Sequence, residues 1–166
     1  MKTASITGGT GGIGTALSLK LIEHGYFVIS THNNKSSSFL KEWKNTHKLN
    51  SDKIKFINCD ITDYSQARIS IEELVEEMNI DLLINNAGIT RDSSFLKMNF
   101  HQWHDVINTN MTANIPSHIL DQIKNDIPTK ELVKPYEIGN TVMYIIDDMP
   151  SLTGCILSVN GGQYMQ

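Results

Sequence analysis

A glycine-rich turn between a short apolar strand and a helix constrains the fold of this chain more than any other feature. Residues 3–16 read TASITGGTGGIGTA. Phosphate oxygens approach backbone N–H groups closely only where side chains are absent, and Gly8, Gly12 and Gly14 give that access at the start of a helix. Glycines also occur in turns and helix caps for backbone reasons alone. The position of this turn at the first strand-to-helix junction favours a dinucleotide-binding site.

Strand-like and helical patterns alternate along the chain. Apolar runs predict strands at Ala4–Thr7, Tyr26–Ser30, Lys55–Asn58, Ile80–Ile84 and Cys155–Val159. Apolar spacings of three and four predict a helix from Ile13 that stops at Gly25, and further helices over Ser38–Lys48, Tyr64–Met78, Phe100–Met111, Ser117–Ile127 and Pro135–Asp147. This order predicts an α/β fold with parallel strands and right-handed crossovers. The apolar continuity of residues 81–84 predicts a strand buried on both faces.

The composition is that of one globular domain rather than a disordered or membrane chain. The 166 residues are 40% hydrophobic and 19% charged, and the mean hydropathy is -0.22. A net charge of -4 and scattered Lys and Arg residues argue against nucleic acid as a partner. We find no secretory signal pattern and no apolar run of about 20 residues, the length that spans a bilayer. We therefore expect a cytoplasmic protein without membrane contact.

The cysteine and histidine spacings do not favour a disulfide or a metal site. Cys59 and Cys155 lie far apart with no further ligand spacing near them, and we expect both to be small core residues. His101 and His104 stand three residues apart on a predicted helix, but no carboxylate or cysteine partner accompanies them. We expect no metal in this protein.

Three motifs in register resemble the short-chain dehydrogenase/reductase family. They are the TGxxxGxG spacing of Thr7–Gly14, the Cys59-Asp60-Ile61 segment and the Asn85–Gly88 segment. Longer matches that resemble the acetoacetyl-CoA reductases lie at Asn86–Asp92, Asn108–Thr112 and Asn160–Met165. Those reductases supply 3-hydroxybutyryl-CoA for polyhydroxybutyrate synthesis. The 3-oxoacyl-acyl-carrier-protein reductases are near neighbours that share many of these motifs.

The resemblance implies a Rossmann-type doubly wound parallel sheet with an NADP(H) site. Its implied cofactor contacts are Gly8, Gly11, Gly12, Ile13, Gly14, Asn33, Lys35, Cys59, Asp60, Ile61, Asn86, Ala87, Gly88, Ile89 and Thr90. Within this set, Asp60 is implied to contact the adenine ring, and the segment from Asn86 supports the strand beside the cofactor. Asp92 lies in the loop where the family's substrate cleft opens, so it is a candidate contact for a CoA ester. A loop aspartate is more often simply exposed to solvent.

The end of the second predicted strand favours NADP(H) over NAD(H). An Asp or Glu at that point would bind the ribose 2′-hydroxyl and repel a 2′-phosphate. Residues 30–35 contain no acid, and Lys35, with His32, could bind the phosphate. The alternative is that Lys35 is a solvated loop lysine. Related reductases more often use an arginine a few residues later, where this chain has Ser38.

The family's catalytic tyrosine and lysine are absent from these 166 residues. The family transfers a hydride from the nicotinamide to a ketone carbon, while a tyrosine protonates the oxygen with the help of a lysine four residues later. Asn110 matches the family's asparagine that holds a relay water. No tyrosine of this chain has a lysine four residues later. The nearest imitation, Tyr64 with Arg68, is expected on a helix surface because an arginine cannot titrate in the useful range.

The missing catalytic segment is expected between Asn114 and Ile115. Residues 1–114 resemble the N-terminal Rossmann part of the family, and residues 115–166 resemble its C-terminal helices and last strand. We expect both parts to belong to a single dinucleotide-binding domain. The absent part corresponds to about two strand–helix units, or roughly 60 to 90 residues.

A deletion of this kind would change the sheet and the subunit contacts. The family's strand order is 3-2-1-4-5-6-7, so the strand at Ile80–Ile84 would become an edge. Pairing of Cys155–Val159 directly against Leu82–Ile84 could close the gap. The family forms homotetramers, and the helix from Phe100, which builds subunit contacts, would lose its second half.

We weigh three functions for the chain. The first is an oxidoreductase of the acetoacetyl-CoA reductase type, or a 3-oxoacyl-acyl-carrier-protein reductase relative, in a shortened form with negligible activity of its own. The second is a noncatalytic remnant that holds NADP(H) through Gly8, Gly12, Gly14, Asp60 and Asn86. The third is a subunit-interaction piece that joins full-length relatives through the C-terminal segment. Assays of NADPH oxidation, nucleotide binding and co-purification with a longer reductase would distinguish them.

Overall fold

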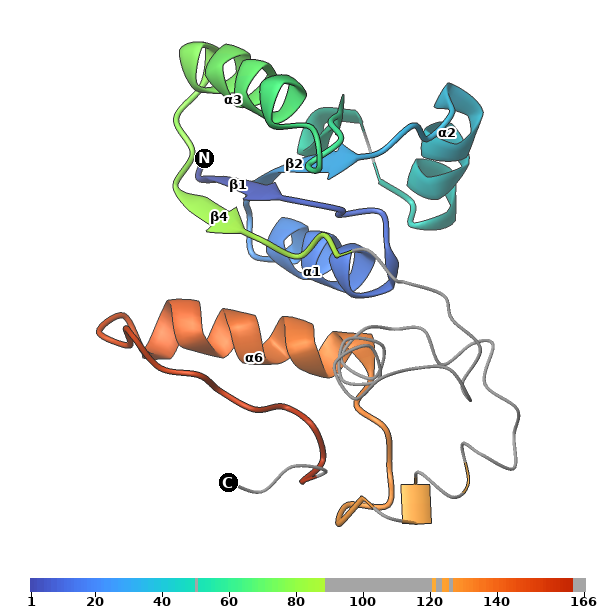
Figure 1. The fold of residues 1–166 in the computed structure, drawn as a ribbon, viewed down its shortest axis with the longest axis vertical. Coiled ribbons are helices and arrows are strands. Elements are labelled where there is room, and N and C mark those ends of the chain that lie inside the picture. The colour runs from blue at the N-terminus through green and yellow to red at the C-terminus, as the bar shows by residue number, and fades with distance from the viewer. Residues whose placement is uncertain (50, 89–120, 122–123, 126, 163–166) are drawn as a thin grey trace. The chain divides into compact units, whose positions relative to one another are not determined.

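A computed structural model describes residues 1–49, 51–88, 121, 124–125 and 127–162 (Figure 1). The chain forms two compact units, Met1–Ala87 and Gly88–Gln166. In the described part of the chain, no helix is long and apolar enough to cross a membrane. Several predicted features lie outside the described residues, namely the helix at Phe100–Met111 and the site residues Ile89, Thr90, Asp92 and Asn110.

The first unit is a parallel four-stranded sheet with helices on both faces (Figure 1). Its strands, in the order β3-β2-β1-β4 across the sheet, are β1 Thr3–Ile6, β2 Phe27–His32, β3 Ile54–Asn58 and β4 Leu82–Ile84. Its helices are α1 Gly12–Glu23, α2 Ser37–Thr46 and α3 Tyr64–Glu77, with a short 3-10 helix, η1, at Ser51–Lys53. The predicted α/β fold is confirmed, and the element boundaries in this unit differ from the predicted ones by one or two residues.

Apolar side chains on the two central strands form the core of this unit. Ala4 and Ile6 of β1, Val28 and Ile29 of β2, and Leu21 of α1 are fully buried. Burying a Val, Leu or Ile side chain stabilises a fold by roughly 1.5–3 kcal/mol. Helices cover both faces of β1 and β2, so side chains on both faces are buried, including the polar Ser5 and Ser30.

Polar side chains start the second and third helices. Ser36 caps α2, where its Oγ accepts a hydrogen bond from the Phe39 N–H at 3.2 Å. Asp63 caps α3, where its carboxylate accepts from the N–H groups of Ser65 and Gln66 at 3.0 and 3.1 Å. Each cap satisfies N–H groups that the first helical turn leaves without a partner.

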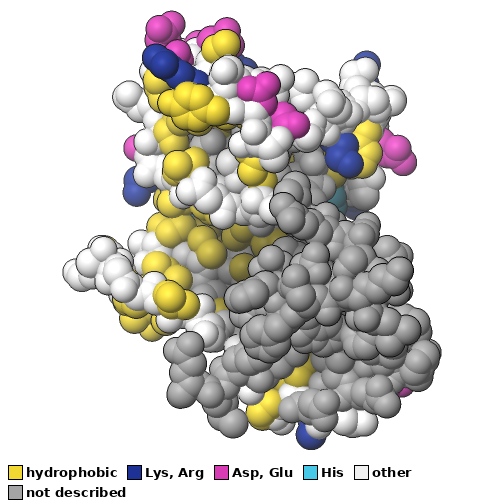
Figure 2. Space-filling view, in the orientation of Figure 1, with side chains coloured by type: hydrophobic (Ala, Val, Ile, Leu, Met, Phe, Trp, Pro, Cys, Tyr) yellow, Lys and Arg dark blue, Asp and Glu magenta, His cyan; other side chains and the backbone are white. Residues whose placement is uncertain are grey.

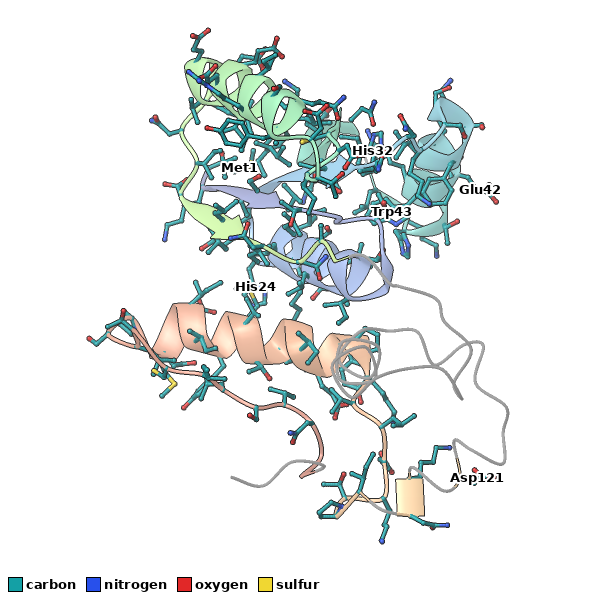
Figure 3. All side chains as sticks on the ribbon, in the orientation of Figure 1. Met1, His24, His32, Glu42, Trp43 and Asp121 are labelled. Carbon is teal, nitrogen blue, oxygen red and sulfur yellow. The ribbon has the colours of Figure 1, made fainter. Side chains whose placement is uncertain are left out.

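A tryptophan joins α2 to the sheet and to α1. Trp43 is buried, and its ring centroid lies 5.5 Å from that of Phe56 on β3 (Figure 3). Its Nε1 donates a hydrogen bond to the Thr15 Oγ1 of α1 at 3.1 Å, so the buried indole N–H has a partner. α1 and α2 therefore lie on the same face of the sheet.

β4 is less buried than its sequence predicts. The apolar run at residues 81–84 predicted burial on both faces, but Leu83 is 60% exposed. Among the described strands, β4 pairs only with β1 and stands at an edge of the sheet. An edge strand lacks the neighbour whose helix would cover it. The prediction of burial on both faces, which rested on the apolar run alone, is therefore wrong for Leu83.

The second unit contains helix α6, Pro135–Asp148. Pro135 stands in the first turn, where its missing N–H costs no helical hydrogen bond, and Glu137 accepts from the Lys134 N–H at 2.6 Å. Met143 is buried. The amphipathic helix predicted from Pro135 is confirmed, and it runs one residue further than predicted.

Only part of the predicted helix at Ser117–Ile127 falls within the described residues. Asp121, Lys124 and Asn125 are helical. Ile127 follows the helix and is buried at 2% exposure. The prediction of a helix here is therefore consistent with the residues that the structure describes.

The segment Cys155–Val159, which was predicted to be a strand, has no regular secondary structure. Ile156 is 94% exposed, and Cys155 is exposed as well. The predictions of a strand and of a core position for Cys155 are therefore wrong. An extended segment becomes a strand only when neighbouring backbone groups complete its ladder, and its apolar composition does not supply them.

The residues after this segment pack against a turn in the same unit. The Thr129 N–H donates to the carbonyl oxygen of Gly161 at 3.2 Å. Gly161 has a φ of +64°, which favours glycine. A cavity of about 360 Å³ lies between residues 129–133 and 158–162.

Candidate cofactor-binding site

The glycine-rich turn follows β1 at the carboxyl end of the sheet. Gly8 has a φ of +65°, a conformation that L side chains rarely adopt. Its N–H donates to the Thr31 Oγ1 of β2 at 3.2 Å, and its carbonyl oxygen accepts from the Gly11 N–H at 3.0 Å. The first bond attaches the turn to β2, and the second joins the two ends of the turn.

Two glycines of the turn are required by close packing inside the protein. A Cβ on Gly14 would overlap the Gly8 carbonyl oxygen and lie 2.8 Å from the Gly9 Cα. A Cβ on Gly9 would overlap the Oγ of the fully buried Ser30. Sequence analysis assigned Gly14 to access for a phosphate and did not single out Gly9. The structure adds a reason for both glycines, because the first turn of α1 lies directly against the loop and the sheet.

The N-terminus of α1 has the features of an anion site. Gly11 precedes the helix in an extended conformation, and among the described residues no side chain caps this terminus. The first turn contains no acidic residue. The N–H groups of Gly12, Ile13 and Gly14 lie in that first turn, where no earlier helical carbonyl is available to accept from them. They therefore stand at the positive end of the helix dipole, where a phosphate is favoured.

Thr7 and Asn86 join the turn to the end of β4. Asn86 Nδ2 donates to the carbonyl oxygens of Thr7 and Gly8 at 2.9 and 3.3 Å. The Thr7 Oγ1 in turn accepts from the N–H groups of Asn86 and Ala87, both at 2.9 Å. The predicted site residues Asn86 and Ala87 thus brace the glycine turn. Thr7 holds this junction together, a role that sequence analysis missed although Thr7 belongs to the TGxxxGxG motif.

The end of β2 carries one neutral and one charged candidate for the 2′-phosphate. His32 is buried, and its Nδ1 accepts from the Lys35 N–H at 3.3 Å (Figure 3). Burial, and secondarily the charge of Lys35, lower the pKa of His32 below its ordinary value. Lys35 is exposed, with its Nζ 4.9 Å from the ring centroid of Phe39. Lys35 rather than His32 therefore carries the positive charge at this point.

Asp60 joins the ends of β2 and β3. Its Oδ1 accepts from the Thr62 Oγ1 and N–H at 2.7 and 2.9 Å, and its Oδ2 accepts from the Asn33 Nδ2 at 2.9 Å. The hydrogen bond from the Thr62 side chain, followed by that from its backbone, lowers the pKa of Asp60. Cys59 is buried as predicted, and Ile61 is 44% exposed. Two predicted contacts, Asn33 and Asp60, thus bond to each other.

The structure brings most of the described site residues to one edge of the sheet. The glycine turn, Lys35, Asp60 and Asn86 all follow the carboxyl ends of parallel strands, where α/β proteins bind ligands. For Gly88, a Cβ would meet nothing within 4 Å among the described residues, so its predicted role has no packing requirement behind it.

Tyr64 and Arg68 lie on a helix surface, as predicted. Tyr64 is 78% exposed at the start of α3. Arg68 Nε lies 2.7 Å from the Glu72 Oε1, one turn further along the helix. The described part of the chain contains no group of three or more His, Cys, Asp or Glu side chains that could hold a metal ion.

A family model described as short chain dehydrogenase matches residues 2–119. The chain belongs to this family. An acetoacetyl-CoA reductase of Acinetobacter sp. (strain RA3849) is 36% identical over 243 aligned positions, which span 99% of this chain and 98% of the relative. A 3-oxoacyl-[acyl-carrier-protein] reductase of Haemophilus influenzae is 31% identical over 143 positions, which span 85% of this chain and 56% of the relative.

The fold is similar to that of a solved structure. A crystal structure of an actinorhodin polyketide ketoreductase variant with NADPH matches with a TM-score of 0.76 at 17% identity, spanning 98% of this chain and 97% of the other. At that identity the match supports the fold alone. It agrees with the Rossmann-type sheet that the family resemblance implied.

The alignments also show how this short-chain dehydrogenase is shortened. The alignment to the Acinetobacter reductase is 243 positions long, and this chain has 166 residues, so at least 77 aligned positions hold no residue of this chain. Alignments to other curated relatives reach only about half of their length, for example 50% and 56%. This minimum of 77 positions lies within the predicted range of roughly 60 to 90 residues for two strand–helix units.

Proposed function

We infer that this short-chain dehydrogenase binds NADP(H) at the carboxyl ends of β1, β2 and β3 and that, as a 166-residue chain, it transfers hydride negligibly. The observation that carries the inference is the glycine turn. Gly8 has a positive φ, the first turn of α1 has no side-chain cap among the described residues, and Asn86 holds the loop in place. A pyrophosphate would accept from the N–H groups of that first turn.

The preference for NADP(H) rests on charge at the end of β2. Residues 30–35 contain no carboxylate that would repel a 2′-phosphate. The Lys35 ammonium is exposed there. The Asp60 carboxylate accepts hydrogen bonds from Asn33 and Thr62, and these donors stabilise its negative charge. The ketoreductase of similar fold was solved with NADPH, and we extend that cofactor class to this chain.

The substrate class that we propose is a 3-oxoacyl-CoA ester such as acetoacetyl-CoA. In such a reaction the cofactor supplies a hydride to the ketone carbon, and a protein group must supply a proton to the oxygen. Asp92 and Asn110 are the proposed substrate contact and relay asparagine. No tyrosine here precedes a lysine by four residues, so the proton donor is missing and turnover is expected to be negligible. An acyl-carrier-protein thioester is the alternative substrate, because the Haemophilus relative is named a 3-oxoacyl-[acyl-carrier-protein] reductase.

The remaining parts of the proposal concern location and assembly. We propose a cytoplasmic protein without nucleic-acid partners, in line with its net charge of -4. The family's homotetramer and a single dinucleotide-binding domain stay predictions. A chain that dissociates to a monomer at micromolar concentration in sedimentation would overturn the tetramer.

A titration of NADPH against the purified chain tests the binding site. Fluorescence of the bound nucleotide should saturate, and NADH should bind more weakly because it lacks the 2′-phosphate. Lys35→Ala should weaken NADPH binding by about 10- to 100-fold and leave NADH binding unchanged, since removing one charge-assisted contact costs roughly 1.5–3 kcal/mol. Absence of saturable NADPH binding would overturn the proposed site.

A second assay tests catalysis separately. Mixing the chain with NADPH and acetoacetyl-CoA should give no loss of absorbance at the nicotinamide band above the rate without protein. A turnover rate in the ordinary range of about 1 to 1,000 per second would contradict the inferred lack of activity. Saturable NADPH binding without turnover is the combination that supports the proposal.

A further inference from the structure

Lys35, the proposed partner of the 2′-phosphate, is exposed in the loop between β2 and α2. Figure 2 shows Lys and Arg side chains at several places on the surface of the first unit. Exposed lysines are common on proteins, and a lysine side chain loses much conformational freedom when a ligand fixes it. What distinguishes Lys35 is therefore sought in the way its backbone is held.

Two side chains accept hydrogen bonds from consecutive backbone N–H groups of this loop. The Asn34 N–H donates to the Asn58 Oδ1 at 2.9 Å, and the Lys35 N–H donates to the His32 Nδ1 at 3.3 Å. Burial lowers the pKa of His32, so its neutral ring offers a lone pair to that N–H. His32, Asn58 and these two N–H groups are called the loop clasp here.

The sheet register places both acceptors of the clasp on the face that α2 covers. His32 of β2 pairs with Asn58 of β3, and two residues earlier Ser30 pairs with Phe56. Alternate residues of a strand share a face, so Asn58 points to the same side as Phe56. The Phe56 ring lies 5.5 Å from that of Trp43 in α2, which identifies this side. The acceptors of the clasp are therefore supplied by two paired strands rather than by the loop itself.

The loop adopts a conformation that needs such support. Asn34 has a φ of +50°, in the left-handed region that few residues other than glycine adopt. Such conformations persist where several contacts enforce them, and they cluster at functional sites. The Asn33 Nδ2 adds a third contact by donating to the Asp60 Oδ2 at 2.9 Å. Contacts from the ends of β2 and β3 thus hold all three loop residues, 33–35.

The start of α2 does not explain the clasp. Ser36 caps this helix through its own Oγ, and Trp43 anchors the helix to β3 and α1. The clasp holds the residues just before the helix, and Lys35 carries the one ionisable side chain among residues 33–36. Its Nζ lies 4.9 Å from the ring centroid of Phe39 in α2. The group that benefits from a fixed loop is therefore the Lys35 ammonium.

The clasp stands beside the glycine turn at the end of β2. Thr31, the residue before His32, accepts from the Gly8 N–H of the turn at 3.2 Å. Thr31 and His32 therefore attach the phosphate-binding turn and the Lys35 loop to the same strand end. Two parts of the candidate cofactor site share one support, at the edge of the sheet where α/β proteins bind ligands.

We propose that His32 and Asn58 are positioning residues that set the preference of this chain for NADP(H). Both act through Lys35, because the clasp fixes its backbone and the ammonium then binds the 2′-phosphate with a smaller loss of freedom. NADH lacks that phosphate, so its binding does not depend on the clasp. The inference rests on the proposed function, and it adds that the charge of Lys35 needs a fixed loop to select the nucleotide.

Nucleotide titrations of an Asn58 variant test the clasp, since Asn58 is exposed and its side chain is not part of the core. Asn58→Ala removes the acceptor of the Asn34 N–H and should weaken NADPH binding about three- to tenfold, the range of one neutral hydrogen bond. NADH binding and the thermal midpoint should stay as in the wild type. Asn45→Ala, the same substitution at an exposed position of α2, is the matched control and should change neither affinity.

A double variant separates positioning from direct contact with the phosphate. In a Lys35→Ala background, Asn58→Ala should weaken NADPH binding no further, because the asparagine acts through the lysine. Without nucleotide, the Asn34 amide should exchange its hydrogen faster in Asn58→Ala than in the wild type. His32→Phe keeps a buried ring but removes the other acceptor, so it should speed exchange at Lys35 and lower the NADPH preference in the same way.

Three outcomes would overturn the inference while leaving the proposed function in place. The first is that Asn58→Ala keeps the wild-type ratio of NADPH to NADH affinity. The second is that it weakens both nucleotides equally, which would give the clasp a general structural role. The third is that it weakens NADPH binding further in the Lys35→Ala background. A wild-type chain that shows no saturable NADPH binding would instead overturn the proposed function, and this inference with it.

Discussion

β2 and the segment Cys155–Val159 have similar apolar sequences and opposite structures. β2 reads FVISTH and pairs with a strand on each side, and its Val28 and Ile29 are fully buried. The segment at 155–159 reads CILSV, has no regular structure and leaves Ile156 94% exposed. Sequence pattern predicted a strand for both. The comparison shows that a strand depends on its neighbours, because its backbone groups must be completed by another chain segment.

The largest expected difference between these regions is in stability. Ile29→Ala removes a fully buried side chain and should lower the free energy of unfolding by about 2–5 kcal/mol. Ile156→Ala removes a side chain that is already solvated, so its effect should stay within about 0.5 kcal/mol. Urea denaturation of both variants measures the difference. Equal losses would mean that Ile156 is buried in solution and that the comparison is wrong.

A smaller effect is expected from the glycines of the cofactor site. Gly14→Ala should lower the free energy of unfolding by about 1–3 kcal/mol, because the new Cβ overlaps the Gly8 carbonyl oxygen. Gly88→Ala is the matched control, since its Cβ meets nothing within 4 Å among the described residues. Thermal unfolding of the two variants, with and without NADPH, provides the measurement. A Gly14→Ala protein as stable as wild type would show that the turn is looser than described.

The smallest effect is a pH dependence at the end of β3. Hydrogen bonds from Thr62, and secondarily from Asn33, favour the ionised form of Asp60, so its pKa in the folded protein lies below its ordinary value. Its contribution to stability is therefore present above the pKa of Asp60 in the unfolded chain and is lost as the pH falls through the pKa in the folded protein. Asp60→Asn should reduce the loss of unfolding free energy that the wild-type chain shows between about pH 5 and 2. If the variant loses as much unfolding free energy as the wild type over this pH range, the pH dependence arises from other carboxylates.

Sequence reasoning succeeded where a residue's role is local. The strands β1 to β3, the turn at Gly8 and the helix surface position of Tyr64 follow from patterns within a few residues. It failed where the role depends on a distant partner. The edge position of β4 decides the exposure of Leu83, and the Oγ of Ser30 decides why position 9 must be glycine.

The same division applies to the candidate site. The motif residues were found because they stand at the spacings that resemble the short-chain dehydrogenase/reductase motifs. Thr7 and Thr31, which hold the turn by hydrogen bonds to Asn86, Ala87 and Gly8, were not singled out. Their hydroxyls bind residues that are 23 to 80 positions away in the sequence, and a short sequence pattern cannot predict such a contact.

Hydrogen exchange of the wild-type chain with and without NADPH tests the central claim most directly. The amides of Gly12, Ile13 and Gly14 should exchange more slowly when NADPH is bound, because the nucleotide's phosphates accept from them, and the amides of Cys155–Val159 should exchange quickly in both states. Unchanged exchange at Gly12, Ile13 and Gly14 at saturating NADPH would contradict the assignment of this turn as the nucleotide site.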